Sequence, residues 1–187
     1  LMGIPTLIKT QTASNSASLD FVDGTDDVVL DGTYDEYMFV FTDLNPVTDS
    51  VDFTFQVNAT DDAGGDYDTS LITSTSFYAL HDEADSSASM GYDTSRDLAQ
   101  SANFQILFGQ VGNGADESGA GVLHLFSPSS TTYVKHWYCR TNHYNAGDYS
   151  FDYHMAGYIN DTTAIDEIQF KMSSGNFDGV IQLYGIA

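Results

Sequence analysis

Apolar and polar residues alternate with a period of two in many short runs of this chain. In residues 51–58, for example, the apolar side chains of Val51, Phe53 and Phe55 alternate with polar ones. Such alternation gives a pleated strand one buried face and one solvated face. We therefore expect a strand in each run, with turns at the glycine, asparagine, aspartate and proline residues between them.

The runs predict about eleven strands. They span residues 6–12, 19–22, 34–44, 51–58, 71–80, 104–111, 122–126, 132–141, 151–160, 165–172 and 180–186. Residues 81–97 should form a long connection with one short helical turn around residues 84–90. This rhythm, with little helical periodicity anywhere, favours an all-β sandwich or barrel of antiparallel strands over alternating β and α units.

Two parts of the pattern carry expectations about strand pairing. The run 34–44 is apolar on both faces, with Tyr37 and Phe39 on one of them, which indicates a central strand or one covered by a neighbouring chain. The last two runs, 165–172 and 180–186, are joined by a segment rich in glycine and asparagine. We expect them to form a terminal β-hairpin whose last strand lies inside a sheet.

A length of 187 residues fits one domain, residues 1–187, with a substantial core. The sequence shows no internal repeat and no linker that would divide it. The single cysteine, Cys139, excludes an internal disulfide framework and is expected to be a small buried hydrophobe. No run of about 18 apolar residues, the length that a membrane-spanning helix requires, occurs.

The composition is strongly acidic: 27 acidic residues against 5 basic ones give a net charge of −22. Binding to nucleic acid requires a basic protein surface, and anionic membranes attract basic segments, so we expect neither as a partner. Strong negative charge also favours solubility and opposes self-association. A stable assembly must therefore close through an apolar or hydrogen-bonded interface, or through bound cations.

Acidic loops are the candidate cation sites. Asp61, Asp62, Asp66 and Asp68 lie in one short loop that contains glycine. Clustered carboxylates on a turn could hold calcium, which takes about six to eight oxygen ligands. The spacing matches no EF-hand template, and aspartate is common in turns for conformational reasons alone. We favour solvated turns, keep calcium as the alternative, and expect no other cofactor.

Catalytic motifs are absent from the sequence. It has no HExxH or HxH pattern for zinc, no GxSxG nucleophile elbow, and no phosphate-binding glycine loop with its lysine. The few glutamates form no pair that stands out for glycoside hydrolysis. We therefore expect no enzymatic activity and no catalytic residue.

Aromatic residues make up 13% of the chain, and several gather in residues 137–153. Trp137, Tyr138 and Tyr144 lie there beside asparagines. Lectin-like sandwiches stack sugars on exposed aromatic rings in such surroundings. We favour the interpretation that these rings fill the core or a subunit interface, and keep sugar binding as the alternative. In a strand, Tyr138 would share a polar face with His136, opposite Trp137.

Five segments resemble virion structural proteins of marine tailed bacteriophages. They read GIPTLIKTQTASNSASLDF, VLDGTYDEYMFVFTDLNPVTDSVDFTFQVN, LHDEADSS, HLFSPSSTTYVKHW and AIDEIQFKMSSGNFDGVIQLYGI. The resemblance covers nearly the whole chain, is strongest at the two ends, and consists of packing and turn patterns. It implies a jelly-roll-like β-sandwich on the virion surface, assembled as a symmetric homotrimer, and it implies no catalytic residue.

The resemblance leads us to expect a non-enzymatic capsid decoration or head-fibre protein. Its partners would be further copies of itself and other virion proteins, such as the capsid or a fibre base. Residues 1–12 would serve as an N-terminal docking strand. The alternative is a tail-fibre or receptor-binding tip of lectin-like type, with a glycan bound by the loops at residues 60–68, 112–121 and 142–148.

Overall fold

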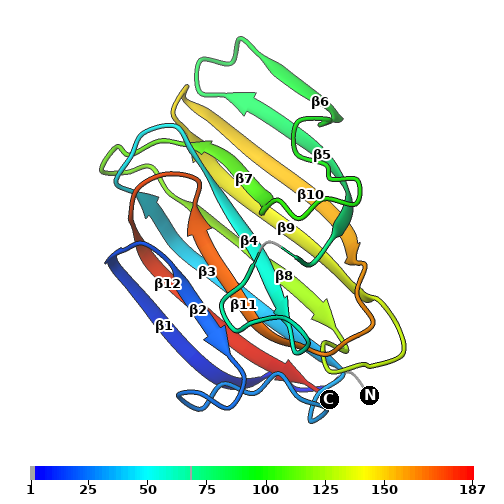
Figure 1. Ribbon diagram of the computed structural model, residues 1–187. Coiled ribbons are helices and arrows are strands. Elements are labelled where there is room, and N and C mark those ends of the chain that lie inside the picture. Colours follow the sequence, from blue (N-terminus) through cyan, green and yellow to red (C-terminus); the bar gives the residue numbers. More distant parts are fainter. Residues whose placement is uncertain (1–2, 68) are drawn as a thin grey trace.

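The computed structural model describes residues 3–67 and 69–187 and consists of β-strands joined by turns and loops (Figure 1). The twelve strands are β1 (Thr6–Ser16), β2 (Leu19–Val22), β3 (Glu36–Pro46), β4 (Val51–Ala59), β5 (Ile72–Asp82), β6 (Ala88–Tyr92), β7 (Gln105–Val111), β8 (Gly119–Phe126), β9 (Lys135–Asn145), β10 (Tyr149–Ile159), β11 (Ile165–Met172) and β12 (Phe177–Ile186). The described residues contain no helix that could cross a membrane. The prediction of an all-β antiparallel sandwich is confirmed, with twelve strands in place of about eleven.

The strands form two layers. The large sheet has the order β1-β12-β3-β8-β9-β10-β5-β6, and the small sheet has the order β7-β4-β11-β2. A single residue pair, Val111 with Asn145, joins β7 to β9 at one corner. Eight strands, in the orders β1-β12-β3-β8 and β2-β11-β4-β7, have the arrangement of a jelly roll. The other four extend the large sheet beyond β8, so that β5 and β6 lie at its far end, at the top of Figure 1.

The prediction of a terminal β-hairpin is wrong. Within the described chain, β11 pairs with β4 and β2, whereas β12 pairs with β1 and β3. Residues 173–176 therefore cross from one sheet to the other. The reason is that the two sheets share one core. Phe170 of β11 and Leu183 of β12 are both fully buried in it and enter it from opposite sheets. The expectation that the last strand lies inside a sheet is confirmed.

The expected helical turn around residues 84–90 is also wrong. The segment instead turns and enters β6, which pairs with β5. Strand β3 does lie in the middle of the large sheet, as its apolar pattern indicates, between β12 and β8. Its Phe39 and Phe41 are buried, whereas Met38 and Val40 on the opposite face are partly exposed.

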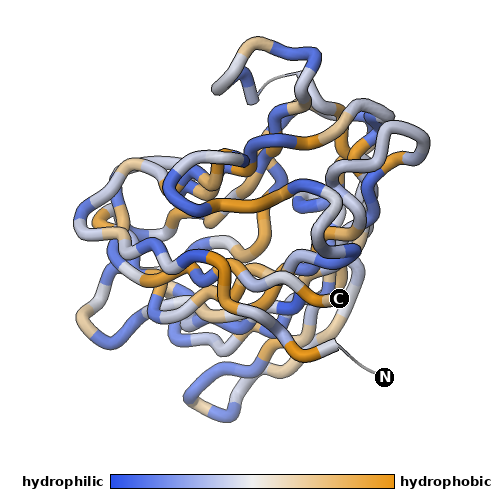
Figure 2. The backbone as a smooth tube through the Cα atoms, turned by 90° about the horizontal axis from the view of Figure 1, so that it is seen from below, coloured by the Kyte–Doolittle hydropathy of each residue, from blue (hydrophilic) through white to orange (hydrophobic). Residues whose placement is uncertain are grey.

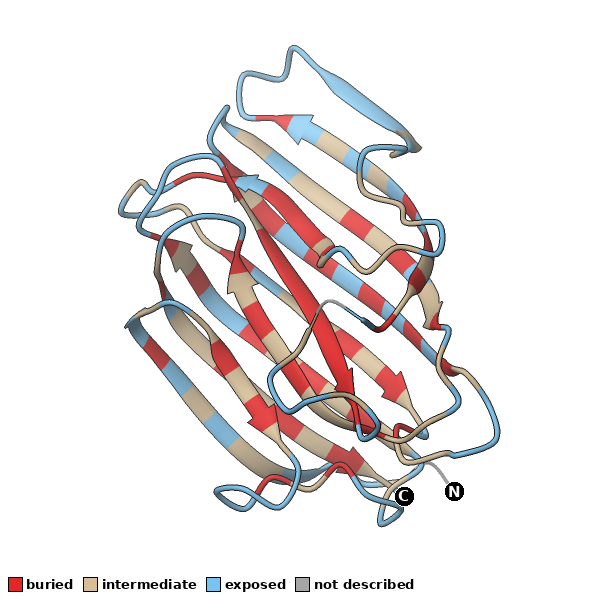
Figure 3. Cartoon of the chain, viewed as in Figure 1, coloured by how far each residue is buried: buried red, intermediate tan, exposed pale blue. Residues whose placement is uncertain are grey.

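Strand β4 departs from the expected alternation because loops cover its outer face. It is buried along nearly its whole length, in contrast to the striped strands of the large sheet (Figure 3). Gln56, expected to be solvated, is fully buried, and its Nε2 donates to the carbonyl oxygens of Ser70, Ala102 and Asn103 at 3.1, 3.1 and 3.3 Å. Buried polar groups require such partners.

Phenylalanine rings form the centre of the core between the sheets. Hydrophobic segments lie within the sandwich, and hydrophilic ones concentrate in the loops around it (Figure 2). Phe170 is at the centre, with the ring centroids of Phe39 and Phe41 each 5.2 Å away. Cys139 is buried as expected, and burial raises the pKa of its thiol, so the group stays protonated.

Candidate functional site

One face of the large sheet packs against the small sheet, and within residues 3–67 and 69–187 the opposite face over β8, β9, β10, β5 and β6 carries partly or fully exposed side chains. We call this surface the outer face. Its main side chains are His124, Tyr138, Arg140, His154, Phe77 and Tyr92. Sheet extension beyond the jelly roll is what creates most of this surface.

Strand register places these residues in rows across the sheet. Arg140 on β9 lies opposite His154 on β10, His154 opposite Phe77 on β5, and Phe77 opposite Tyr92 on β6. Directly opposed residues of neighbouring strands point to the same side of a sheet. The row therefore runs from β9 to the last strand, β6.

Aromatic and imidazole rings stack on the outer face. The His124 and Tyr138 rings are nearly parallel with centroids 4.4 Å apart, and Phe77 and His154 are parallel at 5.2 Å. Tyr138 and Phe77 keep 44% and 48% of their surface exposed. The outer face thus presents flat, partly apolar rings to solvent, as binding surfaces often do.

Charges on the outer face are largely matched within it. Arg140 donates from Nε and a terminal nitrogen to the two carboxylate oxygens of Asp152 at 3.1 and 3.0 Å, and His154 Nε2 lies 3.3 Å from the same carboxylate. These Arg140 hydrogen bonds hold the pKa of Asp152 below its usual range. Glu36 is paired in the same way with His124.

The outer face also carries most of the imidazoles of the chain. Besides His124 and His154, it holds His81 opposite Ser150 and His136 opposite Tyr158. With histidines counted as neutral, as they are in the net charge of −22 for the whole chain, the outer face carries Arg140 against Asp152 and Glu36 and is close to neutral.

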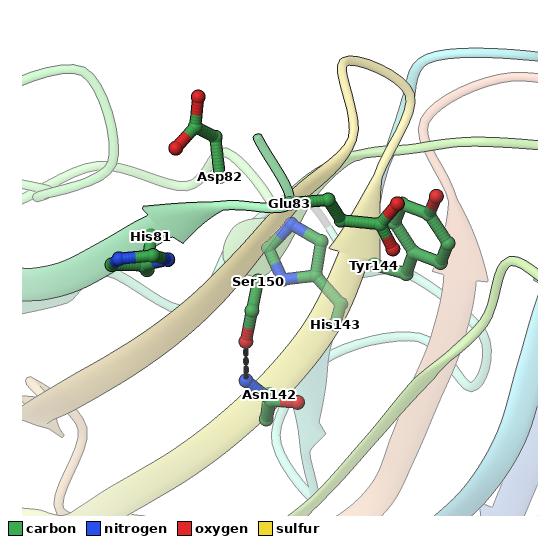
Figure 4. Close-up of a pocket in the computed structure, with 7 residues that line it drawn as sticks. All are labelled: His81, Asp82, Glu83, Asn142, His143, Tyr144 and Ser150. Carbon is green, nitrogen blue, oxygen red and sulfur yellow. Dashed lines mark hydrogen bonds between the residues drawn. The ribbon is translucent and has the colours of Figure 1, made fainter. Parts of the chain in front are cut away.

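A hollow of about 370 Å³ opens where β5 and β9 end and β10 begins (Figure 4). It is lined by His81, Asp82, Glu83, Asn142, His143, Tyr144 and Ser150. Asn142 Nδ2 donates to Ser150 Oγ at 3.0 Å, and the Tyr144 hydroxyl donates to Asp148 at 3.2 Å. Burial, and then the nearby Glu83 and Asp148, raise the pKa of Tyr144 to about 12. These amide, hydroxyl and carboxylate groups could hydrogen-bond a polar ligand such as a sugar.

The structure separates the three aromatic residues singled out from the sequence. Tyr138 lies on the outer face and Tyr144 in the hollow, on strand β9 rather than in a loop. Trp137 is only 2% exposed and meets the Phe55 ring edge-on at 5.1 Å. Its interpretation as a sugar-stacking residue is therefore wrong, because the strand's alternation turns it into the core.

The sequence predicts the strand that carries Phe77 but not its place in the site, and it does not predict strand β6, which carries Tyr92. Phe77 and Tyr92 extend the outer face to its last strand, but residues 81–97 read as a polar connection. At the end of strand β6 two bulky residues, Met90 and Tyr92, alternate with the small Gly91. This brief alternation was the available signal.

The acidic loop is only partly reproduced as a cluster. Carboxylate oxygens of Asp61, Asp62 and Asp161 lie within 4.8 Å of one another, and Asp66 is not part of the group. Asp68 lies outside the described residues. Asp161, far away in the sequence, joins the cluster because the segment before β11 lies beside this loop: Thr60 N–H donates to Ala164 O at 2.9 Å.

A buried lysine lies beside this cluster. Lys135 is fully buried, and its ammonium donates to the carbonyl oxygen of Asp161 at 3.1 Å and to that of Thr163. Burial lowers the pKa of Lys135, while the negative charges of Asp161 and Asp61 oppose this shift. The protein thus supplies a positive charge of its own next to the acidic group.

We expect chelation to leave the melting temperature unchanged, because Lys135 already offsets part of the negative charge of the cluster. Calorimetric scans with a few millimolar EDTA and with a similar excess of calcium would measure this. A bound structural ion stabilises by mass action. A fall of more than about 5 °C in EDTA that calcium reverses would therefore contradict the expectation.

Comparison with known protein families, with curated proteins and with solved structures finds no match to this chain. The jelly-roll arrangement is therefore shown by the strand order alone.

Proposed function

We propose that this chain is a non-enzymatic structural protein of a bacteriophage virion, displayed on the particle surface as a capsid decoration or head-fibre protein. The observation that supports it best is a jelly roll with one broad, nearly neutral sheet face in a chain of net charge −22. Such a face is suited to docking against other proteins, whereas the acidic remainder keeps unassembled copies apart.

The fold is compatible with that role. The strand order agrees with the jelly-roll-like sandwich that the sequence resemblance implies. The chain reaches its fold without disulfides, since Cys139 is buried and free. Dense packing around the central phenylalanine rings stabilises the fold in place of disulfide bonds. A protein exposed on a particle requires such stability.

Assembly would use further copies of the chain and a shell or fibre base. The resemblance implies a homotrimer. Residues 1–12 remain our candidate docking segment: residues 1–2 lie outside the described part, and Thr6 to Thr12 form the first part of β1. Strand β1 pairs along its length with β12 and lies at the edge of the large sheet, a position from which its side chains could contact the shell.

Quantitative mass spectrometry of virions purified from a phage whose genome encodes this chain would test the proposal. A decoration or head-fibre protein should occur in many symmetry-related copies, and cryo-EM of the same particles should place the sandwich on the head. Absence of the chain from purified particles would contradict the proposed function.

A second candidate is a glycan-binding tip of a tail fibre. It is favoured by the exposed Tyr138 ring and by the polar hollow that contains Asn142 and Tyr144. A few copies per virion, together with glycan-array binding that Tyr138→Ala abolishes and Tyr133→Ala retains, would support the tip. Tyr133 is a suitable control because it is 73% exposed in the loop before β9.

A further inference from the structure

The last strand of the large sheet, β6, is an exposed and uncharged edge. Within the described residues it pairs only with β5. Met90 is 78% exposed and Tyr92 is 52% exposed, and the strand sequence ASMGY contains no ionisable residue except the tyrosine. Unpaired backbone groups on an edge strand are a template for a further strand.

The backbone groups that β6 leaves free follow from its register. Asp82 N–H donates to Ser87 O at 3.0 Å, and Asp93 N–H donates to Ser76 O at 2.9 Å, just beyond the two ends of the pairing. Hydrogen-bonded and non-hydrogen-bonded pairs alternate along an antiparallel ladder. Counting inwards from Ser87 and Asp93, the residues that bond to β5 are the odd-numbered ones.

The even-numbered residues of β6 consequently direct their N–H and C=O groups away from the sheet. These are Ala88, Met90 and Tyr92, which are also the residues whose side chains continue the outer face. The free edge is symmetric about Met90, with one free residue two positions to each side. An edge of this kind is complementary to itself when it is turned around.

The other sheet edges are protected, and β6 is not. The free side of β7 is bonded to β9 and the residue after it, since the Thr141 hydroxyl donates to Leu107 O and the Ala146 N–H donates to Gln110 O, both at 3.0 Å. Strand β1 carries Lys9 and has register irregularities at both ends of its pairing with β12, and β2 has only four residues, among them Asp20. Charges, irregularities and shortness are the devices that stop edge strands from pairing. The pairing of β6 with β5 runs without a register shift, and the strand has neither lysine nor proline.

We infer that β6 pairs antiparallel with β6 of a second copy of this chain, about a twofold axis at Met90. In this arrangement Met90 of one copy lies opposite Met90 of the other, and Ala88 lies opposite Tyr92. The two large sheets become one continuous sheet, and the Met90 and Tyr92 side chains of both copies gather on its outer face. The contact depends only on the sheet edge and does not require the proposed function.

Charge favours a second copy as the occupant of this edge. Two chains of net charge −22 repel each other wherever carboxylates meet, and β6 with the neighbouring outer face is the nearly neutral surface through which they can approach. Two acidic residues flank this edge and oppose pairing: the exposed Asp85 in the turn before β6, and Asp97, whose carboxylate accepts from the Tyr92 hydroxyl at 2.7 Å. Because salt screens such charges, with a Debye length of about 10 Å at 0.1 M, the dimer should tighten as salt is raised.

The molar mass of the full chain in solution tests the inference. Light scattering after size exclusion, at up to about 100 µM chain and in raised salt, detects dimers with dissociation constants up to that range. We expect a wild-type mass of twice 20.4 kDa, or of six chains where two of the homotrimers that the resemblance implies join through β6. Met90→Lys, which places like charges opposite each other at the axis, should halve that mass.

Two further variants make the result specific to the edge. Thr75→Lys adds the same charge at an exposed position on the same face of β5 and should leave the mass unchanged. Met90→Pro removes an N–H that points away from β5, so it should spare the fold, shown by an unchanged melting temperature, and still abolish the dimer.

A wild-type chain that is monomeric, or has an odd-numbered mass such as that of a trimer, would overturn the inference. So would a mass that Met90→Lys and Met90→Pro leave unchanged, or that Thr75→Lys reduces equally. The proposed function is judged separately, by the presence of the chain in virions.

Discussion

Replacing Phe170 with alanine is expected to lower the free energy of unfolding by about 3–5 kcal/mol, the usual cost of truncating a fully buried phenylalanine. Phe170 has no exposed surface and lies where the two sheets meet. Its ring contacts Phe39 and Phe41 of the large sheet and stacks on Phe53 of the small sheet at 5.9 Å. The substitution leaves a cavity that both sheets line, and rigid rings collapse poorly into such a space.

Urea denaturation at neutral pH would measure this loss, with Phe77→Ala as the control. Phe77 is also a phenylalanine in a strand, but it lies on the outer face and is 48% exposed. Its truncation removes far less buried surface and should cost about 1 kcal/mol or less. Equal destabilisation by the two substitutions would contradict a core centred on Phe170.

The sequence predicts this core well because alternation is a local property of a strand. The pattern around Phe53 and Phe55 identifies the inward residues of β4, and the pattern around Tyr37 and Phe39 identifies the central strand β3. The same alternation separates Tyr138 from Trp137 on β9. What each strand buries can be read before its neighbours are known.

Which strands become neighbours cannot be read in the same way. Consecutive strands with a turn between them usually pair, and this rule wrongly predicts a hairpin for β11 and β12. Pairing depends on both sheets sharing one core, which is a property of the whole chain. The burial of Gln56 and the approach of Asp161 to Asp61 likewise depend on segments distant in sequence.

Only part of the candidate site could be predicted from the sequence, for the same reason. Tyr138 and His136 can be assigned to one face from the sequence, but nothing local indicates that β10, β5 and β6 extend that face. Strand β6 is short and contains glycine and serine, so its propensity is weak and its place in the sheet is decided by pairing with β5. The outer face emerges only when the register of five strands is known.

Acidification is expected to weaken the fold through His143, by up to about 3 kcal/mol as the pH falls from 6.5 to 4. His143 is 1% exposed and lies against the rings of Phe108 and Phe151 at 5.3 and 5.5 Å. Its Nε2 donates to the Gly109 carbonyl oxygen at 2.7 Å, and its Nδ1 is buried without a partner. Burial, aided by the charge of Arg96, lowers the pKa of His143 to about 4.

The sign of this effect follows from the two pKa values. An unfolded histidine takes up its proton near pH 6.5, whereas folded His143 resists protonation down to pH 4. Between these values protons bind preferentially to the unfolded state, so the free energy of unfolding falls as the pH falls. Above pH 6.5 both states are neutral at this position, and His143 contributes no pH dependence.

Urea denaturation of wild type and of His143→Gln between pH 7.5 and 4.5 would isolate this contribution, since other titrating groups contribute almost equally to both proteins. Glutamine stays neutral and keeps an amide donor for Gly109, so the variant, though less stable at neutral pH, should lose little further stability from pH 6.5 to 4.5. His81→Gln, which removes an exposed histidine, should follow the wild-type curve. A variant curve as steep as that of wild type, or an NMR titration of His143 in the folded protein near pH 6.5, would show that the buried ring accepts a proton freely.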